Sequence, residues 1–411
     1  MKYIKFLFIF ALILFPFGEL LRFQINHYVA IKPIDLVVGV TVVWWLIYQI
    51  VKIKDQKYKL TFNNVINNKF ALPFILFVSI GLISLLINLA WLKMDQFLVS
   101  LFYLIRFVSY ALLLPIVLQF DQKFKKIITV FLFIDGIVIL VIGYLQYIFY
   151  NSLQGLFHLG WDEHMHRMFS TFLDPNFAGG FLVLYLLFVS GFVMKQKTGS
   201  RKQILFIILL LVTLLAMFLT FSRSSFLMLL AGSAAFFIII QRKKLLVVLL
   251  SFVALFIFSV SPQFYDENMN LFRVASSMSR LENYQFAFRV IEDHPVIGVG
   301  FNSYRYVKDM YGMPRDWVDA PSHADAGVDN SFLFVLATTG IIGLICYLWF
   351  WIRILRKLLI EYKKKKKIFV AVAFASIIGL CIHALFINSL FFAPLMLWLF
   401  VLIGLEDTEL H

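Results

Sequence analysis

The stretch from residue 203 to residue 240 reads QILFIILLLVTLLAMFLTFSRSSFLMLLAGSAAFFIII and contains a single charged residue, Arg223. Each apolar run beside Arg223 has about 17 to 19 residues, which as a helix rising about 1.5 Å per residue nearly crosses the hydrocarbon core of a bilayer. Inside that core the backbone must satisfy its own hydrogen bonds, so a helix is the expected conformation. The stretch therefore predicts two membrane-spanning helices, near 203–221 and 224–240, joined by a tight turn at Arg223.

Apolar segments of this kind recur along the whole chain. Its 411 residues are 62% hydrophobic and 15% charged, with a mean hydropathy of +0.88, which is more apolar than a soluble core requires. The first segment resembles a signal peptide, but no small-residue cleavage site follows it, so we interpret it as an anchor. The sequence predicts an all-α integral membrane protein with about twelve transmembrane helices, near 3–18, 34–51, 70–90, 97–119, 127–149, 176–194, 203–221, 224–240, 245–260, 331–352, 368–387 and 389–405.

One polar stretch of about seventy residues, from 261 to 330, interrupts this series of spans. It divides the chain into an N-terminal bundle of about nine spans (1–260), a large, partly helical loop (261–330), and a C-terminal bundle of about three spans with a short tail (331–411). Arginines outnumber lysines among the basic residues of the loop. Because a guanidinium binds phosphate or carboxylate oxygens two at a time, we expect the loop to take part in binding or catalysis.

Alternate connections between the spans differ in their basic residues. Lysines concentrate in one set, which includes the lysine run at 363–367, whereas arginines prevail in the other. The positive-inside rule then places the lysine-rich side and both termini in the cytoplasm, and the 261–330 loop outside. Lysines on the inner side contact anionic membrane lipids, so the net charge of +14 does not indicate a nucleic-acid partner.

Arg223 lies in a turn too short to need a charge for solubility. Ser222 or Ser224 can cap the helix that follows, and the backbone N–H groups there, together with the guanidinium, could form an anion pocket at the membrane surface. The alternative is an interfacial arginine whose head group extends into water.

The loop itself contains a predicted helix at 279–293. Arg280 falls at the edge of its apolar face and has no carboxylate three or four residues ahead, so we expect its partner to be a ligand or another helix. Arg289 lies on the opposite side and can pair with Glu292 or Asp293, which makes it a candidate brace.

Arg167 precedes another span, and Asp174 can cap that span. His164 and His166 alternate in a loop, which gives no fixed metal-binding geometry, and we expect no metal site there. At the far end of the large loop, His323 and Asp329 are candidate proton acceptors, although Asp329 could equally be a helix cap.

Two charged residues stand inside predicted spans, where an isolated charge is costly. Arg106 lies roughly 13 Å and Asp135 roughly 18 Å from the outer face, on the estimate of about 1.5 Å per residue and a 30 Å core. These depths predict a structural ion pair between Arg106 and Asp135. A proton or ion path through the two residues is the competing interpretation.

Several segments, in this order, resemble the superfamily of O-antigen ligases and Wzy-type O-antigen polymerases, and they cover most of residues 160–350. They are Thr-Phe-Ser-Arg at 220–223, Arg280 followed by Pro-Val-Ile-Gly-Val-Gly at 295–300 and Tyr304, Asp-Asn-Ser-Phe-Leu at 329–333, and Gly-Ile-Ile-Gly at 340–343. The resemblance implies a GT-C-like fold and a glycosyltransferase of the bacterial cytoplasmic membrane. Its substrates would be glycans carried by undecaprenyl diphosphate, used at the external face.

The resemblance also assigns roles to particular residues. Arg223 and Arg280 match the arginines thought to hold the diphosphate, Arg289 lies at the R-x10-G spacing of some polymerases, and Arg167 lies in a segment similar to an external turn of the family. Ligases commonly have a histidine directly before the asparagine that ends the loop, but here that residue is Asp329. The departure favours polymerase-like chemistry with Asp329 or His323 as the base.

The predicted activity is an inverting glycosyl transfer that uses neither a metal nor a cofactor. Its partners would be an undecaprenyl-diphosphate-linked oligosaccharide, a glycan or lipid acceptor, and membrane lipids. The alternative is a transporter or flippase for lipid-linked glycans or anionic solutes, which would use Arg106, Asp135 and the outer arginines as a path. A sensor or assembly scaffold is a third, weaker hypothesis.

Overall fold

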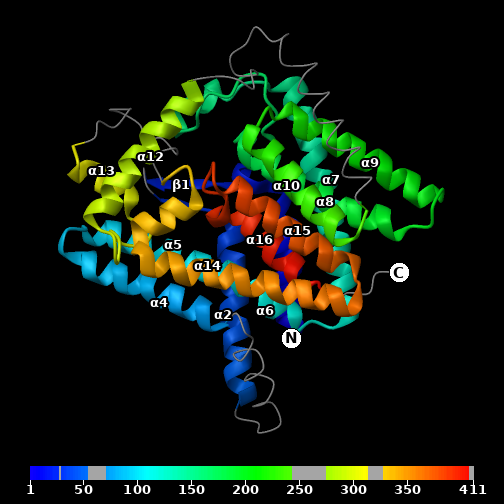
Figure 1. The fold of residues 1–411 in the computed structure, drawn as a ribbon, viewed down its shortest axis with the longest axis horizontal. Helices are drawn as coiled ribbons and strands as arrows, with labels where there is room; N and C mark the ends of the chain where they lie inside the picture. Colours follow the sequence, from blue (N-terminus) through cyan, green and yellow to red (C-terminus); the bar gives the residue numbers. More distant parts are fainter. Residues whose placement is uncertain (27–28, 54–70, 243–274, 313–326, 407–411) are drawn as a thin grey trace.

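The computed structural model describes residues 1–26, 29–53, 71–242, 275–312 and 327–406 (Figure 1). Within these ranges, eight helices are long and apolar enough to cross a membrane, and three shorter apolar helices accompany them. The predicted class, an all-α membrane protein, is confirmed; the predicted span near 245–260 lies outside the described residues. The helices and strands are α1 (Lys2–Leu14), η1 (Phe15–Leu21), β1 (Phe23–Asn26), β2 (Val29–Ile31), α2 (Pro33–Ile53), α4 (Ala71–Ile87), η2 (Asn88–Ala90), α5 (Met94–Ala111), α6 (Leu113–Leu118), α7 (Gln122–Phe149), η3 (Gln154–Leu159), η4 (Ser170–Phe172), α8 (Pro175–Lys195), α9 (Arg201–Leu219), α10 (Arg223–Ile239), α12 (Ala275–Asp293), α13 (Tyr304–Met310), α14 (Ser331–Lys365), α15 (Ile368–His383), η7 (Ser389–Phe391) and α16 (Ala393–Gly404).

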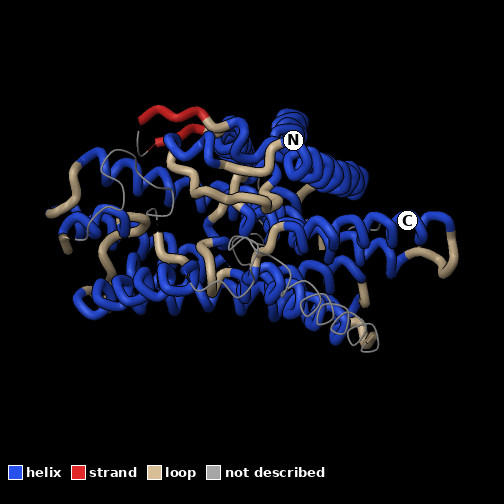
Figure 2. Tube along the Cα trace, turned by 90° about the horizontal axis from the view of Figure 1, so that it is seen from above, coloured by secondary structure: helices blue, strands red, loops and turns tan. Residues whose placement is uncertain are grey.

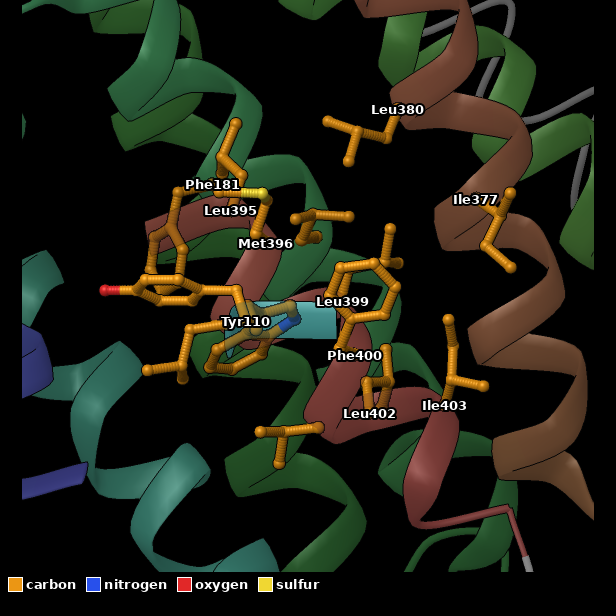
Figure 3. Close-up of a cluster of buried hydrophobic side chains, with 14 of the residues drawn as sticks. Tyr110, Phe181, Ile377, Leu380, Leu395, Met396, Leu399, Phe400, Leu402 and Ile403 are labelled. Carbon is orange, nitrogen blue, oxygen red and sulfur yellow. The ribbon is translucent and has the colours of Figure 1, made fainter. Parts of the chain in front are cut away.

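The core of the bundle is aromatic and aliphatic. Every residue of α16 is buried, and the ring centroid of Trp398 lies 5.0 Å from that of Phe181 and 5.4 Å from that of Phe188, both on α8. Figure 3 shows Leu395 and Leu399 of α16 inside this core. α9 lies at the periphery (Figure 1). It exposes a run of leucine and isoleucine side chains, as expected of a helix that faces lipid.

Several connections meet at one end of the bundle, which we call the loop end. The short two-stranded hairpin β1–β2 lies there (Figure 2), and η1 packs against η4. Met168 N donates to Leu219 O at 2.8 Å, which ties the connection before α8 to the end of α9. Ser331 N donates to Ala384 O at 2.8 Å, which ties the start of α14 to the end of α15. Segments that are far apart in the sequence are therefore neighbours at this end.

α14 is broken at Gly340, whose φ of 66° and ψ of −173° lie outside the helical region. The segment that follows α12 runs alongside this break. Val299 N donates to Ala337 O at 3.1 Å, and Gly300 N donates to Thr338 O at 3.0 Å. Carbonyl groups that lose their helical partners at the break thus accept hydrogen bonds from the loop.

Glycine is required on both sides of this contact, which we call the loop joint (295–300 against 337–341). A Cβ atom on Gly298 would lie 2.5 Å from the backbone of α14, and one on Gly340 would lie 2.1 Å from Val296 O. Both distances are far shorter than any van der Waals contact. The Gly-x-Gly of the loop therefore serves close backbone packing.

The joint fixes the helices of the large loop to the bundle. α12 begins no later than Ala275, so Ser279 lies inside the helix and the predicted start at 279 is wrong. A small second core forms beneath α12 and α13 from Phe286, Ala287, Val290, Val299, Tyr304, Val307, Val328, Phe334 and Ala337. Because these side chains come from the loop and from α14, the described part of the loop is folded against the membrane bundle.

Candidate functional site

The starts of α8 and α10 are joined by buried hydroxyl groups at the loop end. Ser222 Oγ donates to Asn176 Oδ1 at 2.9 Å, and Ser225 Oγ donates to Ser222 Oγ at 2.9 Å. A Cβ atom on Gly179 would lie 2.4 Å from Ser225 Oγ, so glycine permits the close approach of the two helices. Both helices thus direct their N-terminal ends, which carry partial positive charge, toward the same place.

Arg280 reaches this place from α12. Its charge acts on Arg223 at the first position of α10, on Asp174 at the start of α8, and on Asp329 before α14. Arg223 and Arg280 are both half-buried. The structure therefore brings together the two arginines that the sequence singled out, with two carboxylates beside them.

Asp174 and Asp329 play different structural parts. Asp174 accepts from Asn176 N at 2.6 Å and from Phe177 N at 3.4 Å, so it caps α8, as the sequence indicated. Burial raises the pKa of Asp174, and the nearby charges of Arg167 and Arg280 oppose that rise.

Asp329 is not the cap of α14. Asn330 Oδ1 accepts from Phe332 N at 2.9 Å and from Leu333 N at 3.0 Å, so the cap interpretation of Asp329 is wrong. The Tyr284 hydroxyl donates to the backbone oxygen of Asp329 at 3.0 Å and holds that segment in place. Burial raises the pKa of Asp329, and the positive charge of Arg280 lowers it. The carboxylate of Asp329 is therefore not used to cap the start of α14.

Arg167 lies behind the α9–α10 turn and is only 3% exposed. Its Nε donates to Thr220 O at 2.8 Å and its Nη2 donates to Phe221 O at 3.4 Å. These carbonyl groups belong to the end of α9, where no further helical donors follow. Arg167 thus braces the turn that carries Arg223, whereas contact of Arg167 with a diphosphate stays a prediction.

Arg289 is exposed on α12. Among the ion pairs of the described residues, none joins it to Glu292 or Asp293, and the Tyr311 hydroxyl instead donates to Asp293. The predicted brace is therefore absent, because both carboxylates are exposed and water solvates them. A role of Arg289 in diphosphate binding stays a prediction.

The predicted pair between Arg106 and Asp135 is wrong. Arg106 Nε lies 3.1 Å from Asp35 Oδ1 in the first turn of α2, and the Tyr110 hydroxyl donates to the same oxygen at 2.6 Å. Asp135 is buried on α7 beside Tyr185 of α8. Depth in the membrane could be estimated from the sequence, but the face that each helix turns toward its neighbours could not. A shared path through the two residues loses its support.

His383, the last residue of α15, is not among the residues that the sequence pattern indicates. Its side chain is fully buried, and its Nε2 lies 3.5 Å from Ser225 Oγ. A Cβ atom on Gly180 would lie 3.1 Å from its ring. A lone histidine in an apolar span was the available signal. The other histidine considered, His323, lies outside the described residues.

Comparison with protein families identifies the part of the chain that contains this site. Residues 205–348 match the family model described as O-antigen ligase. The match runs from α9 through α10, α12 and α13 to α14, and it includes Arg223, Arg280, Asp329 and the loop joint. A search of the curated proteins gave no match. Residues 205–348 therefore match an O-antigen ligase domain, and this match supports a relationship to the O-antigen ligase/Wzy superfamily of membrane glycosyltransferases.

Proposed function

We propose that this protein polymerises or transfers glycans carried by undecaprenyl diphosphate at the external face of the bacterial cytoplasmic membrane, with polymerase-like chemistry. The observation that carries the proposal is the position of Arg280, which acts on Arg223, Asp174 and Asp329 at the loop end. Two guanidinium groups near two helix N-termini suit a diphosphate. A carboxylate beside them suits the proton transfer that glycosyl transfer requires.

In the proposed reaction a hydroxyl oxygen of the acceptor attacks the anomeric carbon from the side opposite the diphosphate. The bond between the anomeric carbon and the diphosphate oxygen breaks, its electron pair leaves with the diphosphate, and the configuration inverts. Arg223 and Arg280 neutralise the charge that develops on the leaving group. Such fixed charges are most effective where water is excluded, and both arginines are half-buried.

Asp329 takes the proton of the attacking hydroxyl in this mechanism. Its carboxylate lies near Arg280, and burial raises its pKa toward the range in which a carboxylate is an effective base. His323 is the alternative base, and it lies outside the described residues. The presence of Asp329, where ligases commonly have histidine, favours a polymerase over a ligase.

The test uses purified protein in lipid nanodiscs with an undecaprenyl-diphosphate-linked oligosaccharide. Glycan transfer and release of undecaprenyl diphosphate are measured for the wild type, Arg223→Ala and Arg280→Ala. We expect transfer by the wild type and a loss of about 10²-fold or more for each variant. Lys93→Ala, which removes an exposed cation before α5, is the matched control and should transfer normally. If the protein moves the lipid-linked glycan across the membrane of sealed vesicles but transfers no glycan, the enzyme hypothesis is wrong and the transporter hypothesis is supported.

A further inference from the structure

The backbone of Asp329 is held by two neighbouring side chains of α12. Asn283 Oδ1 accepts from Asp329 N at 3.3 Å, and the Tyr284 hydroxyl donates to Asp329 O at 3.0 Å. One acceptor and one donor thus satisfy both backbone polar groups of this residue. Because the two bonds come from the same helix, the peptide units on both sides of Asp329 are fixed relative to α12.

The Tyr284 hydroxyl also reaches a third segment. It lies 2.7 Å from Leu385 O, just after the end of α15, so two carbonyl groups share its single hydrogen. The start of α14 and the end of α15 are already joined by the bond from Ser331 N to Ala384 O. Tyr284 therefore adds α12 to an existing contact between the two membrane helices.

The residues beside Asp329 have structural contacts of their own. Val328 is buried in the second core, and Asn330 caps α14. Asp329 differs from them, because none of the hydrogen bonds among the described residues uses its carboxylate, although both of its backbone groups are bonded. The fold thus fixes the backbone at this position and does not use the acidic side chain to do so.

Arg280 lies on the same face of α12 as the two side chains that hold Asp329. Residues three and four positions apart are neighbours on a helix, and Asn283 and Tyr284 follow Arg280 at these two distances. The positive charge of Arg280 acts on Asp329, which agrees with this placement. One helix face therefore carries the proposed partner of the leaving diphosphate and also holds the proposed base.

The proposed reaction gives a reason for such a connection. The anomeric carbon lies between the attacking hydroxyl and the departing diphosphate, so the base and the cation must keep a fixed separation. Misplacement of a reacting group by about 1 Å can cost about 10²-fold in rate. A single helix that carries Arg280 and holds Asp329 would keep the two groups in register.

We propose that Asn283 and Tyr284 are positioning residues, which hold Asp329 in register with Arg280 so that its carboxylate meets the acceptor hydroxyl. This inference rests on the proposed function, in which Asp329 is the base. Neither side chain touches the substrate, and both act through the backbone of Asp329. Their loss should therefore lower kcat and leave the binding of the diphosphate by Arg223 and Arg280 unchanged.

The first experiment measures transfer in lipid nanodiscs for Tyr284→Phe and Asn283→Ala. Each change removes one of the two bonds, and we expect kcat to fall about tenfold or more while KM for the lipid-linked donor stays within about twofold. Tyr311→Phe and Gln285→Ala are the matched controls and should keep the kcat of the wild type. Tyr311 donates to Asp293 at the far end of α12, and Gln285 is exposed.

The melting temperature of each variant separates positioning from stability. If it falls but the folded protein keeps the kcat of the wild type, the two residues serve only the fold and the proposal is wrong. If Tyr284→Phe fails to fold, Asn283→Ala carries the test, because its side chain is half-buried and alanine favours the helix.

The second experiment is a double-mutant cycle with Asp329→Asn. If Tyr284 acts through Asp329, Tyr284→Phe should lower kcat about tenfold in the wild-type background and less than about twofold once the base is removed. Equal losses in the two backgrounds would overturn the positioning role and leave the proposed function standing. Asp329→Asn with the kcat of the wild type would remove Asp329 as the base, and the positioning role with it. No transfer by the wild type would overturn both proposals.

Discussion

The loop joint and the arginine site lie in the same domain and depend on opposite kinds of interaction. The joint is made by backbone groups, with Val299 N and Gly300 N bonded to α14 and with no room for a Cβ atom on Gly298 or Gly340. The arginine site is made by side-chain charges that are half-exposed. A change of shape should therefore destroy the joint, whereas a change of charge should destroy the site. The difference separates residues that position the loop from residues that we propose to act on substrate.

The largest effect is expected from Gly340→Ala. The backbone of Gly340 has a φ of 66°, which a residue with a Cβ atom rarely adopts, and the added atom would lie 2.1 Å from Val296 O. Strain and overpacking together should cost about 3–5 kcal/mol and lower both folded yield and melting temperature. Gly39→Ala is the matched control, because a Cβ atom there meets nothing within 4 Å. Equal melting temperatures for the two variants would contradict the claim that close backbone packing at Gly340 stabilises the fold.

Arg280→Ala should leave the fold intact and remove most of the activity. The side chain is half-buried, so we expect the melting temperature to stay within about 2 °C of the wild type. If Arg280 stabilises the leaving diphosphate as proposed, loss of its charge should lower kcat by about 10²- to 10³-fold. If Arg280→Ala lowers the melting temperature but the remaining folded protein has the kcat of the wild type, Arg280 stabilises the fold and does not take part in the reaction.

These two regions also show what the sequence could reveal. Hydropathy is a local property, so it located the spans and the turn at Arg223, and the charge pattern drew attention to Arg280. The partner of Gly298 lies about forty residues further along the chain, in a helix break that no local pattern predicts. Helix faces are equally hidden from a single sequence. For that reason the sequence paired Arg106 with Asp135, whereas the structure pairs it with Asp35.

Arg167→Ala tests an arginine whose observed hydrogen bonds go to backbone carbonyl groups. Two carbonyl groups at the end of α9 would lose their donors, and we expect a loss of about 2 kcal/mol in the free energy of unfolding. Chemical denaturation of the purified protein measures it, with Arg289→Ala as the exposed control. Unchanged stability together with lost diphosphate binding would instead assign Arg167 to the ligand.

The pH dependence of transfer tests the electrostatics of Asp329. Burial raises its pKa in the folded protein, and a base must be ionised, so the rate should fall as the pH drops through this raised value. The charges of Arg280 and, less strongly, Lys308 lower the pKa of Asp329. Lys308→Gln removes one of them, so the acid limb of the pH–rate profile should move to higher pH. The rate at the plateau should stay within about fivefold.

Lys93→Gln supplies the control for this shift, since its cation is exposed and does not act on Asp329. An acid limb that moves equally in both variants would reflect the general surface charge. An acid limb that moves in neither would remove Asp329 as the base and leave His323 as the candidate.

The smallest effect is expected from Arg289→Gln. Arg289 has the R-x10-G spacing to Gly300, but its side chain is exposed, and α12 turns Arg280 toward the site. Gly300 in this spacing belongs to the joint, where its N–H bonds to Thr338 O. The two residues of the R-x10-G spacing therefore differ in role: Gly300 packs in the loop joint, and Arg289 is exposed to solvent. We expect kcat/KM within about twofold of the wild type and an unchanged melting temperature. A loss of kcat/KM as large as that of Arg280→Ala would mean that substrate reaches the exposed face of α12. The site would then extend beyond the N-terminal ends of α8 and α10.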